Sequence, residues 1–160
     1  MVSPLLYVFL LSLAPSFEGR YAILVGTKLG LAPLESLAAA TLGILLLSLT
    51  LPLILPSIDR LAATLADDDI RVVSPLARRY LAYMERVRVR ARPYVEKYGF
   101  LGLSIFVAIP LPGTGVWTGA IAGYILGVSR RRLMLALLAG GIASNIISFL
   151  AVSAYRLGTG

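Results

Sequence analysis

A backbone break inside a long uncharged run constrains this chain more than any other feature of its sequence. The run extends from Gly99 to Ser129, and two prolines and three glycines fall between Ile109 and Gly119. Proline removes a backbone donor and clashes with the preceding turn, while glycine adds backbone freedom, so a regular helix cannot continue here. In hydrocarbon, the freed backbone groups find no water and need cover from protein or from a water-filled cavity. Transporters build substrate sites from broken helices in this setting, so this segment is the first candidate site.

The composition is that of a membrane protein with several apolar spans. Hydrophobic residues make up 58% of the 160 residues and charged residues only 14%, which is far from the balance of a soluble domain. The net charge of +7 resides in basic residues that flank apolar runs, which indicates membrane topology rather than nucleic-acid binding. The chain has no Cys and no His, and its acidic residues are scattered. We therefore expect no metal site, no cofactor and no enzymatic activity.

Only two of the apolar segments are long enough to cross a membrane, since a crossing needs about 20 residues. The predicted crossing helices are Ser36–Leu55 and Leu133–Ala154. Four shorter segments form two broken pairs, each interpreted as two half-helices in a hairpin: Leu5–Leu13 with Tyr21–Leu31, and Gly99–Ile109 with Val116–Gly127. The N-terminal apolar stretch lacks a preceding basic residue and a small-residue cleavage site, so we expect it to remain in the mature protein.

The distribution of basic residues orients these segments. Nine basic residues lie in the polar region Ile58–Lys97, and three more follow at Arg130, Arg131 and Arg132. Cytoplasmic loops collect Lys and Arg, so both loops are predicted to be cytoplasmic and both chain termini to lie outside. The second broken pair must then cross an even number of times, either by dipping in and returning or by crossing twice. These features predict a multi-pass protein of the plasma membrane.

The arrangement of one hairpin and one crossing helix occurs twice, at an offset of 97 residues. The positions that are identical between the two copies without a gap include Pro15, Gly26, Leu29, Gly30, Ala39, Gly43 and Leu53, which match Pro112, Gly123, Leu126, Gly127, Ala136, Gly140 and Leu150. A second similarity matches Ala22-Ile23 with Ala108-Ile109. Its offset is 86 residues, which disagrees with the 97-residue repeat. Each copy crosses an odd number of times, so the copies have opposite orientations, as in transporters with inverted repeats.

We therefore expect an all-α integral membrane fold in a single domain of residues 1–160. Residues 1–56 form the first repeat and residues 99–160 the second, and each repeat is a re-entrant broken-helix hairpin followed by one transmembrane helix. Residues 57–98 form a basic, amphipathic cytoplasmic linker between them.

The linker contains one amphipathic helix. From Ser74-Pro75 onward, apolar residues recur at helical spacing as far as Tyr98, with a bend expected near Pro93. Arginines occupy other faces, namely Arg78, Arg79, Arg86, Arg88, Arg90 and Arg92. Such a helix is suited to lie on an anionic cytoplasmic leaflet, and the alternative is recognition of a soluble partner.

Glu18 and Arg20 are the charged candidates for a functional site. They lie at the tip of the first hairpin, and ionisable residues at membrane depth mark ion or substrate pathways by default. Two residues apart on a helix, they would not face each other, so each is expected to find another partner or a cavity. The alternative is that residues 1–17 lie on the membrane surface and that this pair is interfacial.

The second hairpin and the last helix supply the uncharged candidates. They are Pro110, Pro112, Gly113 and Gly115, which form the break, Thr114 and Thr118 beside it, and Trp117 and Asn145, which are expected to line it. For each side chain there is a structural alternative. The hydroxyl groups can satisfy freed carbonyls, Trp117 can anchor the chain at the membrane interface, and Asn145 can form interhelical hydrogen bonds.

Two motifs resemble a known family. The residues from Phe106 to Gly119 resemble the signature of the small multidrug-export membrane proteins of bacteria and archaea. The segment from Glu18 to Ile23 resembles their first motif, Glu-x-Arg-x-Ala-Ile-Pro, although Leu24 replaces the usual proline. The resemblance covers nearly the whole chain and implies an exporter of drug-like amphiphiles.

The same residues are distantly similar to DedA-type proteins, which have two re-entrant hairpins, an acidic residue in the first and an arginine after Pro-Gly in the second. That similarity implies flipping or scrambling of a lipid carrier of the polyprenyl-phosphate type, coupled to an ion gradient. Because Gly115 stands in place of that arginine, Arg20 is the expected contact for an anionic head group and Glu18 the expected proton site.

Several functions remain open on this basis. The favoured one is a transporter of an amphiphilic small molecule or lipid. The alternatives are a passive channel and a non-transporting membrane scaffold whose basic helix recruits a partner. The expected partners are membrane lipids, the cargo and, because so little backbone is buried, a second copy of the chain in a homodimer.

Overall fold

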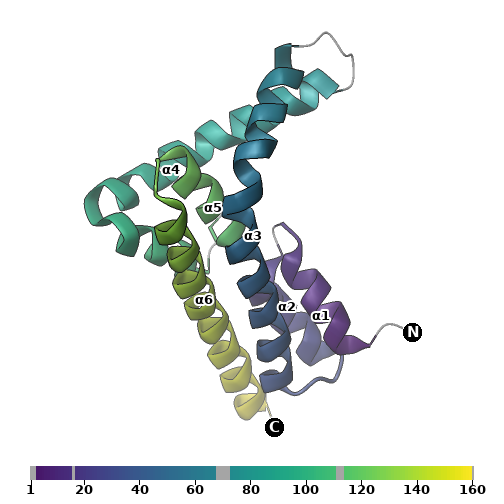
Figure 1. Cartoon of the computed structure of the whole chain (residues 1–160). Helices are drawn as coiled ribbons and strands as arrows, with labels where there is room; N and C mark the ends of the chain where they lie inside the picture. Colours follow the sequence, from purple (N-terminus) through teal and green to yellow (C-terminus); the bar gives the residue numbers. More distant parts are fainter. Residues whose placement is uncertain (1–2, 16, 68–72, 111–113, 160) are drawn as a thin grey trace.

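The computed structural model describes residues 3–15, 17–67, 73–110 and 114–159, and every regular element in these ranges is a helix (Figure 1). The helices are α1 (Pro4–Leu13), α2 (Glu18–Lys28), α3 (Pro33–Asp67), α4 (Val73–Ala108), α5 (Val116–Ile125) and α6 (Arg130–Thr159). The all-helical class expected from the sequence is confirmed over the described part of the chain. Of the predicted break, residues 111–113 lie outside these ranges, and with them Pro112 and Gly113.

Helices α3 and α6 form the long axis of the molecule. The stretches Pro33–Leu65 and Arg130–Arg156 have mean hydropathies of 2.3 and 2.1 and are long and apolar enough to cross a membrane. They contain both predicted crossing segments. The two helices pack side by side and run in opposite directions, since the start of α3 lies near the end of α6 (Figure 1). Helix α3 continues to Asp67 and spans roughly 52 Å, so it extends beyond a hydrocarbon core of about 30 Å.

Short helices pack beside the two long helices α3 and α6. Helices α1 and α2 have 10 and 11 residues and pack on each other and on α3, while the 10-residue α5 packs on the last part of α4. Each is roughly 15 Å long, which is too short to cross a bilayer. Ser3 starts α1, because its hydroxyl accepts a hydrogen bond from the N–H of Leu6 at 3.3 Å and Pro4 takes the first turn.

Helix α4 is divided at Gly99, whose φ of 54° and ψ of −125° are not helical. The bend expected near Pro93 is therefore misplaced by six residues. Proline fixes φ but remains compatible with a helical backbone, whereas the left-handed conformation at Gly99 changes the chain direction at little steric cost. The short part after Gly99 is the first arm of the second hairpin, and α5 is its second arm.

The helices of the two halves have equivalent bounds. Moved by 97 residues, the bounds of α2 fall within one residue of those of α5, and the first residue of α3 falls on the first residue of α6. Both short helices end at a glycine with positive φ, Gly30 at 89° and Gly127 at 71°. The competing offset of 86 would match residues inside α2 with the end of α4, and it brings no bound of α2 or α3 onto a bound of another helix.

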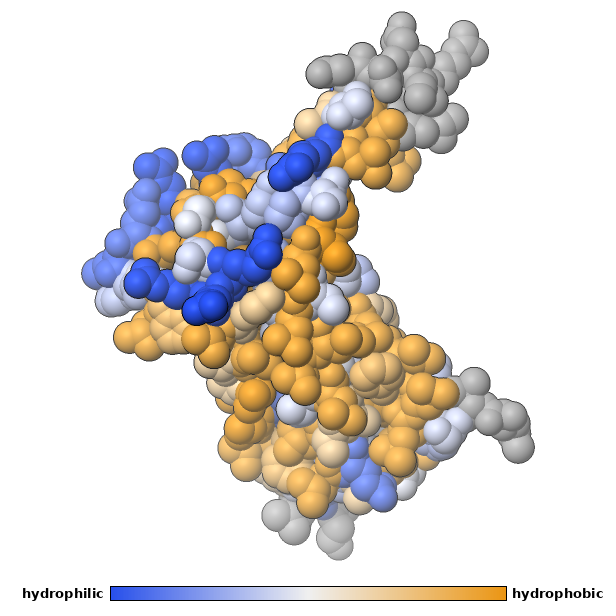
Figure 2. All heavy atoms as spheres, viewed as in Figure 1, coloured by the Kyte–Doolittle hydropathy of each residue, from blue (hydrophilic) through white to orange (hydrophobic). Residues whose placement is uncertain are grey.

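Two apolar clusters hold the helices together. The larger one joins α3, α4, α5 and α6 and includes Leu51, Val87, Val107, Ala120 and Leu137. The smaller one joins α1, α2, α3 and α6 through residues that include Val8, Ile23, Ala40 and Val152. The outside of the body is also apolar, as Figure 2 shows for the part around α3 and α6. Such an outer surface is suited to lipid rather than water.

The basic part of α4 covers one end of this body. Its buried residues are Ala77, Met84, Val87 and Ala91, and the last three belong to the larger apolar cluster. All six predicted surface arginines, Arg78, Arg79, Arg86, Arg88, Arg90 and Arg92, are exposed. The expected apolar stripe is therefore correct at its centre, but Leu76 and Tyr98 at its ends are exposed. Their spacing fits the helix, but the described part of the chain leaves both side chains uncovered.

Candidate functional site

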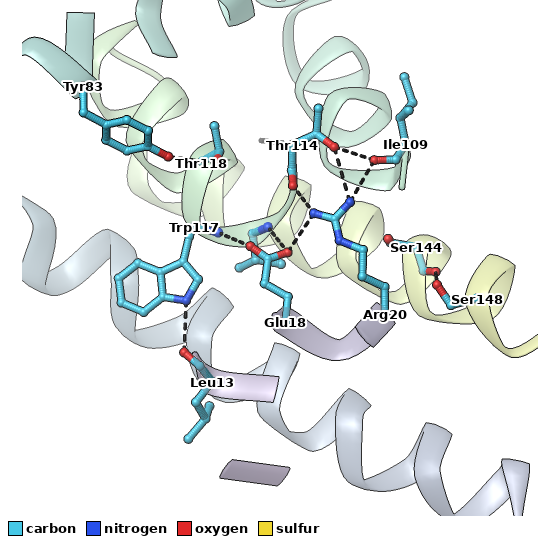
Figure 3. Close-up of polar contacts among 11 residues, drawn as sticks. Leu13, Glu18, Arg20, Tyr83, Ile109, Thr114, Trp117, Thr118, Ser144 and Ser148 are labelled. Atoms are coloured by element: carbon cyan, nitrogen blue, oxygen red, sulfur yellow. Dashed lines mark hydrogen bonds and ion pairs between the residues drawn. The ribbon is translucent and has the colours of Figure 1, made fainter. Parts of the chain in front are cut away.

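The tips of the two hairpins meet at Glu18. This residue follows the turn after α1, and its N–H donates to the carbonyl of Ala14 at 3.2 Å. Glu18 has a φ of 47°, and it is the one non-glycine residue with positive φ among the described residues. That conformation is uncommon for a residue with a side chain, and strained backbone of this kind concentrates at functional sites. It aims the carboxylate away from α2 and at the start of α5 (Figure 3).

The Glu18 carboxylate binds the N-terminus of α5. Its Oε2 accepts from the N–H of Val116 at 3.2 Å, and its Oε1 accepts from the N–H of Trp117 at 3.3 Å. The first N–H groups of a helix have no partner within the helix and lie at its positive end, so a carboxylate is favoured there. Gly115 permits the approach, because a Cβ at this position would collide with the carboxylate, and its φ is 131°.

Arg20 completes the contact between the two hairpin tips, which we call the junction. Its Nη2 forms an ion pair with Glu18 Oε2 at 3.2 Å and donates to the carbonyl oxygen of Thr114. Its Nη1 donates to the carbonyl of Ile109 at 3.3 Å and to Thr114 Oγ1 at 3.4 Å. The Thr114 hydroxyl in turn donates to the Ile109 carbonyl at 2.6 Å. Arg20 thus binds the carbonyls of Ile109 and Thr114, which lie on either side of the break in the second hairpin (Figure 3).

The expectation that Glu18 and Arg20 would not face each other is wrong. It assumed helical backbone at both residues, and the positive φ of Glu18 turns its side chain toward Arg20. The side chains of Arg20 and Glu18 are only 7% and 6% exposed. Burying two charges costs desolvation free energy, which the ion pair and the additional hydrogen bonds offset. The pair is electrically neutral as a unit, and each buried charge is stabilised by the opposite charge of the other residue.

Trp117 and Asn145 flank the charged pair. The indole Nε1 of Trp117 donates to the carbonyl of Leu13 at 3.1 Å, which links the second hairpin to the end of α1. Asn145, in α6, lies against Gly19, and its Nδ2 donates to Thr41 Oγ1 at 3.3 Å. The residue is 1% exposed, and within the described part of the chain its Oδ1 has no hydrogen-bond partner. Polar atoms of both hairpins and of both long helices therefore meet here.

The remaining sequence candidates lie elsewhere. Thr118 faces away from the pair and contacts the hydroxyl of Tyr83 at 3.3 Å, which ties α5 to the basic part of α4. Pro110 is exposed and borders a groove beside Arg20. Among the described residues, no group of three or more acidic, His or Cys side chains could hold a metal ion.

Several atoms of the candidate site have no signal in the sequence because they belong to the backbone. The N–H groups of Val116 and Trp117 and the carbonyls of Leu13 and Ile109 are of this kind. An indirect signal exists for the N–H groups, because a helix that begins directly after a glycine-rich break presents donors there. No sequence signal points to Tyr83.

A comparison with known families identifies the chain. Residues 18–147 match the sequence model of the family described as "Putative small multi-drug export protein". The chain belongs to this family. The matched region begins at Glu18 and includes both hairpin tips, α3, α5 and Asn145, so every residue of the junction except the end of α1 lies inside it. No curated protein and no solved structure matches the chain. The distant similarity to DedA-type proteins stays a prediction.

Proposed function

We propose that this protein is an integral-membrane transporter that exports an amphiphilic small molecule, with Glu18 and Arg20 in its ion and substrate pathway. The family description supports export, and the two long apolar helices support a place in the membrane. The observation that carries the proposal is the buried Glu18–Arg20 pair, which joins the tips of two broken hairpins. Buried ionisable groups at such breaks are a feature of transport pathways.

The proposed architecture is a pair of inverted repeats, residues 1–56 and 99–160, joined by a cytoplasmic linker of residues 57–98. The equivalent helix bounds and the antiparallel α3 and α6 support this arrangement. The short helices support re-entrant hairpins that enter from opposite faces and meet at Glu18. The exposed arginines of α4, together with Arg130, Arg131 and Arg132, support a cytoplasmic position for that end and an outside position for both termini.

Proton binding at Glu18 is the proposed coupling step. A protonated carboxyl group has no charge to attract Arg20 and binds the N-terminus of α5 less strongly. The junction then loses the charged contacts of Glu18 and is held only by the bonds of Arg20 to Ile109 and Thr114 and of Trp117 to Leu13, which weakens the attachment of the two hairpins to each other. Arg20 becomes available to an anionic group of the cargo, and loss of the proton on the other side restores the junction.

A flux assay in proteoliposomes tests this function. With an imposed pH difference, wild-type protein should move a drug-like amphiphile faster than without one. Glu18→Gln fixes the site in its neutral form, so its flux should lose the dependence on the gradient. Glu35→Gln makes the same chemical change at an exposed residue of α3 and should behave as wild type. Wild-type gradient dependence in Glu18→Gln would remove Glu18 from the coupling mechanism.

The same assay separates the other candidate functions. A lipid-carrier flippase would move a polyprenyl-phosphate lipid in preference to the drug-like probe. A membrane scaffold would move neither, with or without a gradient. Channel-like flux would continue in Glu18→Gln and would not respond to the pH difference in wild-type protein.

A further inference from the structure

The partners of the Glu18 carboxylate are all hydrogen-bond donors. Oε1 accepts from the N–H of Trp117 at 3.3 Å, and Oε2 accepts from the N–H of Val116 and from Arg20 Nη2, both at 3.2 Å (Figure 3). A protonated carboxyl group carries an O–H donor of its own, and a donor cannot bond to these groups. A buried donor without an acceptor costs free energy. Neutral Glu18 therefore needs an acceptor outside this set.

Asn145 presents an acceptor next to Glu18. It lies near the middle of α6, a helix that packs on α2. Its amide lies against Gly19, because a Cβ at that position would collide with Oδ1. Gly19 directly follows Glu18, and the Cα atoms of neighbouring residues are only about 3.8 Å apart. The amide oxygen is therefore within reach of the Glu18 side chain.

This acceptor is buried and unused. The other amide atom, Nδ2, donates to Thr41 Oγ1 at 3.3 Å, which holds the amide between α3 and α2. Asn145 is 1% exposed, and its Oδ1 has no hydrogen-bond partner within the described part of the chain. Buried polar atoms are nearly always hydrogen-bonded in folded proteins, so an exception calls for an explanation. The missing partner and the missing acceptor of neutral Glu18 fit each other.

We infer that Asn145 Oδ1 accepts the O–H of Glu18 when this carboxyl group is protonated. The inference rests on the proposed proton step and adds the residue that stabilises its product. A proton from water neutralises the carboxylate, the bonds of Glu18 to α5 and Arg20 break, and one O–H···O bond to Asn145 forms. The side chain thus moves from the second hairpin to α6. Asn145 is a positioning residue, because it holds the proton-binding residue in its neutral state.

The charged surroundings of Glu18 are simple. Arg20 is the one charged side chain in contact with it among the described residues. Helices α1 and α5 contain no charged residue, and the charged residues of α3 and α6 lie toward the helix ends. The titratable residues of these helices and of α2, besides the pair itself, are Lys28, Glu35, Asp59, Arg60, Asp67, Arg130, Arg131, Arg132, Arg156, Tyr7, Tyr21, Tyr124 and Tyr155. A substitution at Asn145 alters none of these groups.

An infrared pH titration of the full chain in phosphatidylcholine nanodiscs tests the inference. Glu18 is observed as the carboxyl C=O band that is present in wild-type protein and absent from Glu18→Gln. Asn145→Leu removes the acceptor without a change in charge. The midpoint of this band should fall by about 0.5–1 pH unit, since the neutral form loses one hydrogen bond. A purely structural effect has the opposite sign, because apolar surroundings disfavour the charged carboxylate and raise the midpoint.

Two further variants make the result specific to Asn145. Asn145→Val places a smaller apolar side chain against Gly19 and should give the same downward shift. Ser36→Ala removes another fully buried hydroxyl that lacks a partner among the described residues, but one that lies against Gly26. Gly26 is roughly 10 Å from Gly19 along α2, so this control should titrate as wild type. An unchanged or raised midpoint in both Asn145 variants would overturn the inference.

The titration and the flux assay fail independently. A lowered midpoint in Asn145→Leu, with no flux in wild-type protein, would refute the export function and leave the acceptor role. Gradient-dependent flux in wild-type protein, with an unchanged midpoint in Asn145→Leu, would refute the acceptor role alone. Absence of the Glu18 band from wild-type protein would refute proton binding at Glu18 and the inference with it.

Discussion

Among single residues, Glu18 and Arg20 are the most sensitive to substitution. Arg20→Met leaves the Glu18 carboxylate buried without its charge partner and should destabilise the fold by about 3–5 kcal/mol. Glu18→Gln/Arg20→Met removes both charges and should recover most of that loss. Thermal unfolding in detergent, followed by circular dichroism, measures both variants. If Arg20→Met unfolds at the wild-type temperature, the pair is not buried as a unit.

The single residue Tyr80 predicts how the stability of the fold depends on pH. Burial raises the pKa of its phenol to about 12, and the nearby Asp59 carboxylate and Tyr124 contribute to the shift. The neutral phenol is therefore favoured in the folded state, and an unfolded tyrosine titrates near pH 10. The stability from this group is complete below about pH 10 and is lost as the pH rises toward 12.

Tyr80→Phe provides the measurement. Within the described part of the chain, the hydroxyl of Tyr80 is buried without a hydrogen-bond partner, so its removal should not destabilise the protein near neutral pH. An absorbance titration of tyrosinate should lose its latest component in this variant. Tyr83→Phe, which removes a more exposed phenol on the same helix, should retain that component. Loss of the late component in Tyr83→Phe instead would contradict the assignment.

At the scale of single elements, the two short helices should depend equally on their terminal glycines. Gly30 and Gly127 both have positive φ, and in each case the next N–H reaches back five residues, from Leu31 to Gly26 at 3.1 Å and from Val128 at 2.9 Å. Alanine at either glycine should cost about 1–2 kcal/mol. Leu29→Ala, where φ is −81° and the side chain is exposed, is the control and should cost little. Markedly different costs at the two glycines would count against equivalent hairpins.

The elements themselves were largely predictable from the sequence. Period, length and the proline and glycine breaks placed all four short segments and both long helices, because these features determine where a helix can exist. The helix ends were less predictable, since α3 continues twelve residues past Leu55 and α2 begins at Glu18. Propensity alone does not stop a helix at Leu55, and α3 packs against α4, which a local pattern does not specify.

The candidate site was predictable in its members but not in its geometry. Glu18 and Arg20 could be predicted as site residues because they are charged and lie in an apolar part of the sequence. Thr114 and Gly115 could be predicted because they lie in the backbone break. Their pairing depends on one positive φ at a glutamate, which no local pattern specifies. Likewise, the partner of Thr118 is Tyr83, which lies 35 residues earlier in the chain. The two side chains come into contact only because α4 packs against α5.

For the whole molecule, we propose that two hairpins enter from opposite faces of the membrane and meet at the Glu18–Arg20 pair. The chain contains no cysteine, so single cysteines can be introduced without further changes. Ser3 and Ala32 mark the two ends of the first hairpin, and Tyr98 and Ser129 mark those of the second; all four are exposed.

Labelling of these four single-cysteine variants with an impermeant maleimide, in intact cells and in inverted vesicles, is the decisive measurement. Ser3→Cys and Ala32→Cys should react from the outside, and Tyr98→Cys and Ser129→Cys from the cytoplasm. Reaction of the two ends of either hairpin from opposite faces would mean that the hairpin crosses the membrane. That result would contradict the inverted repeats and the meeting of two re-entrant hairpins at Glu18.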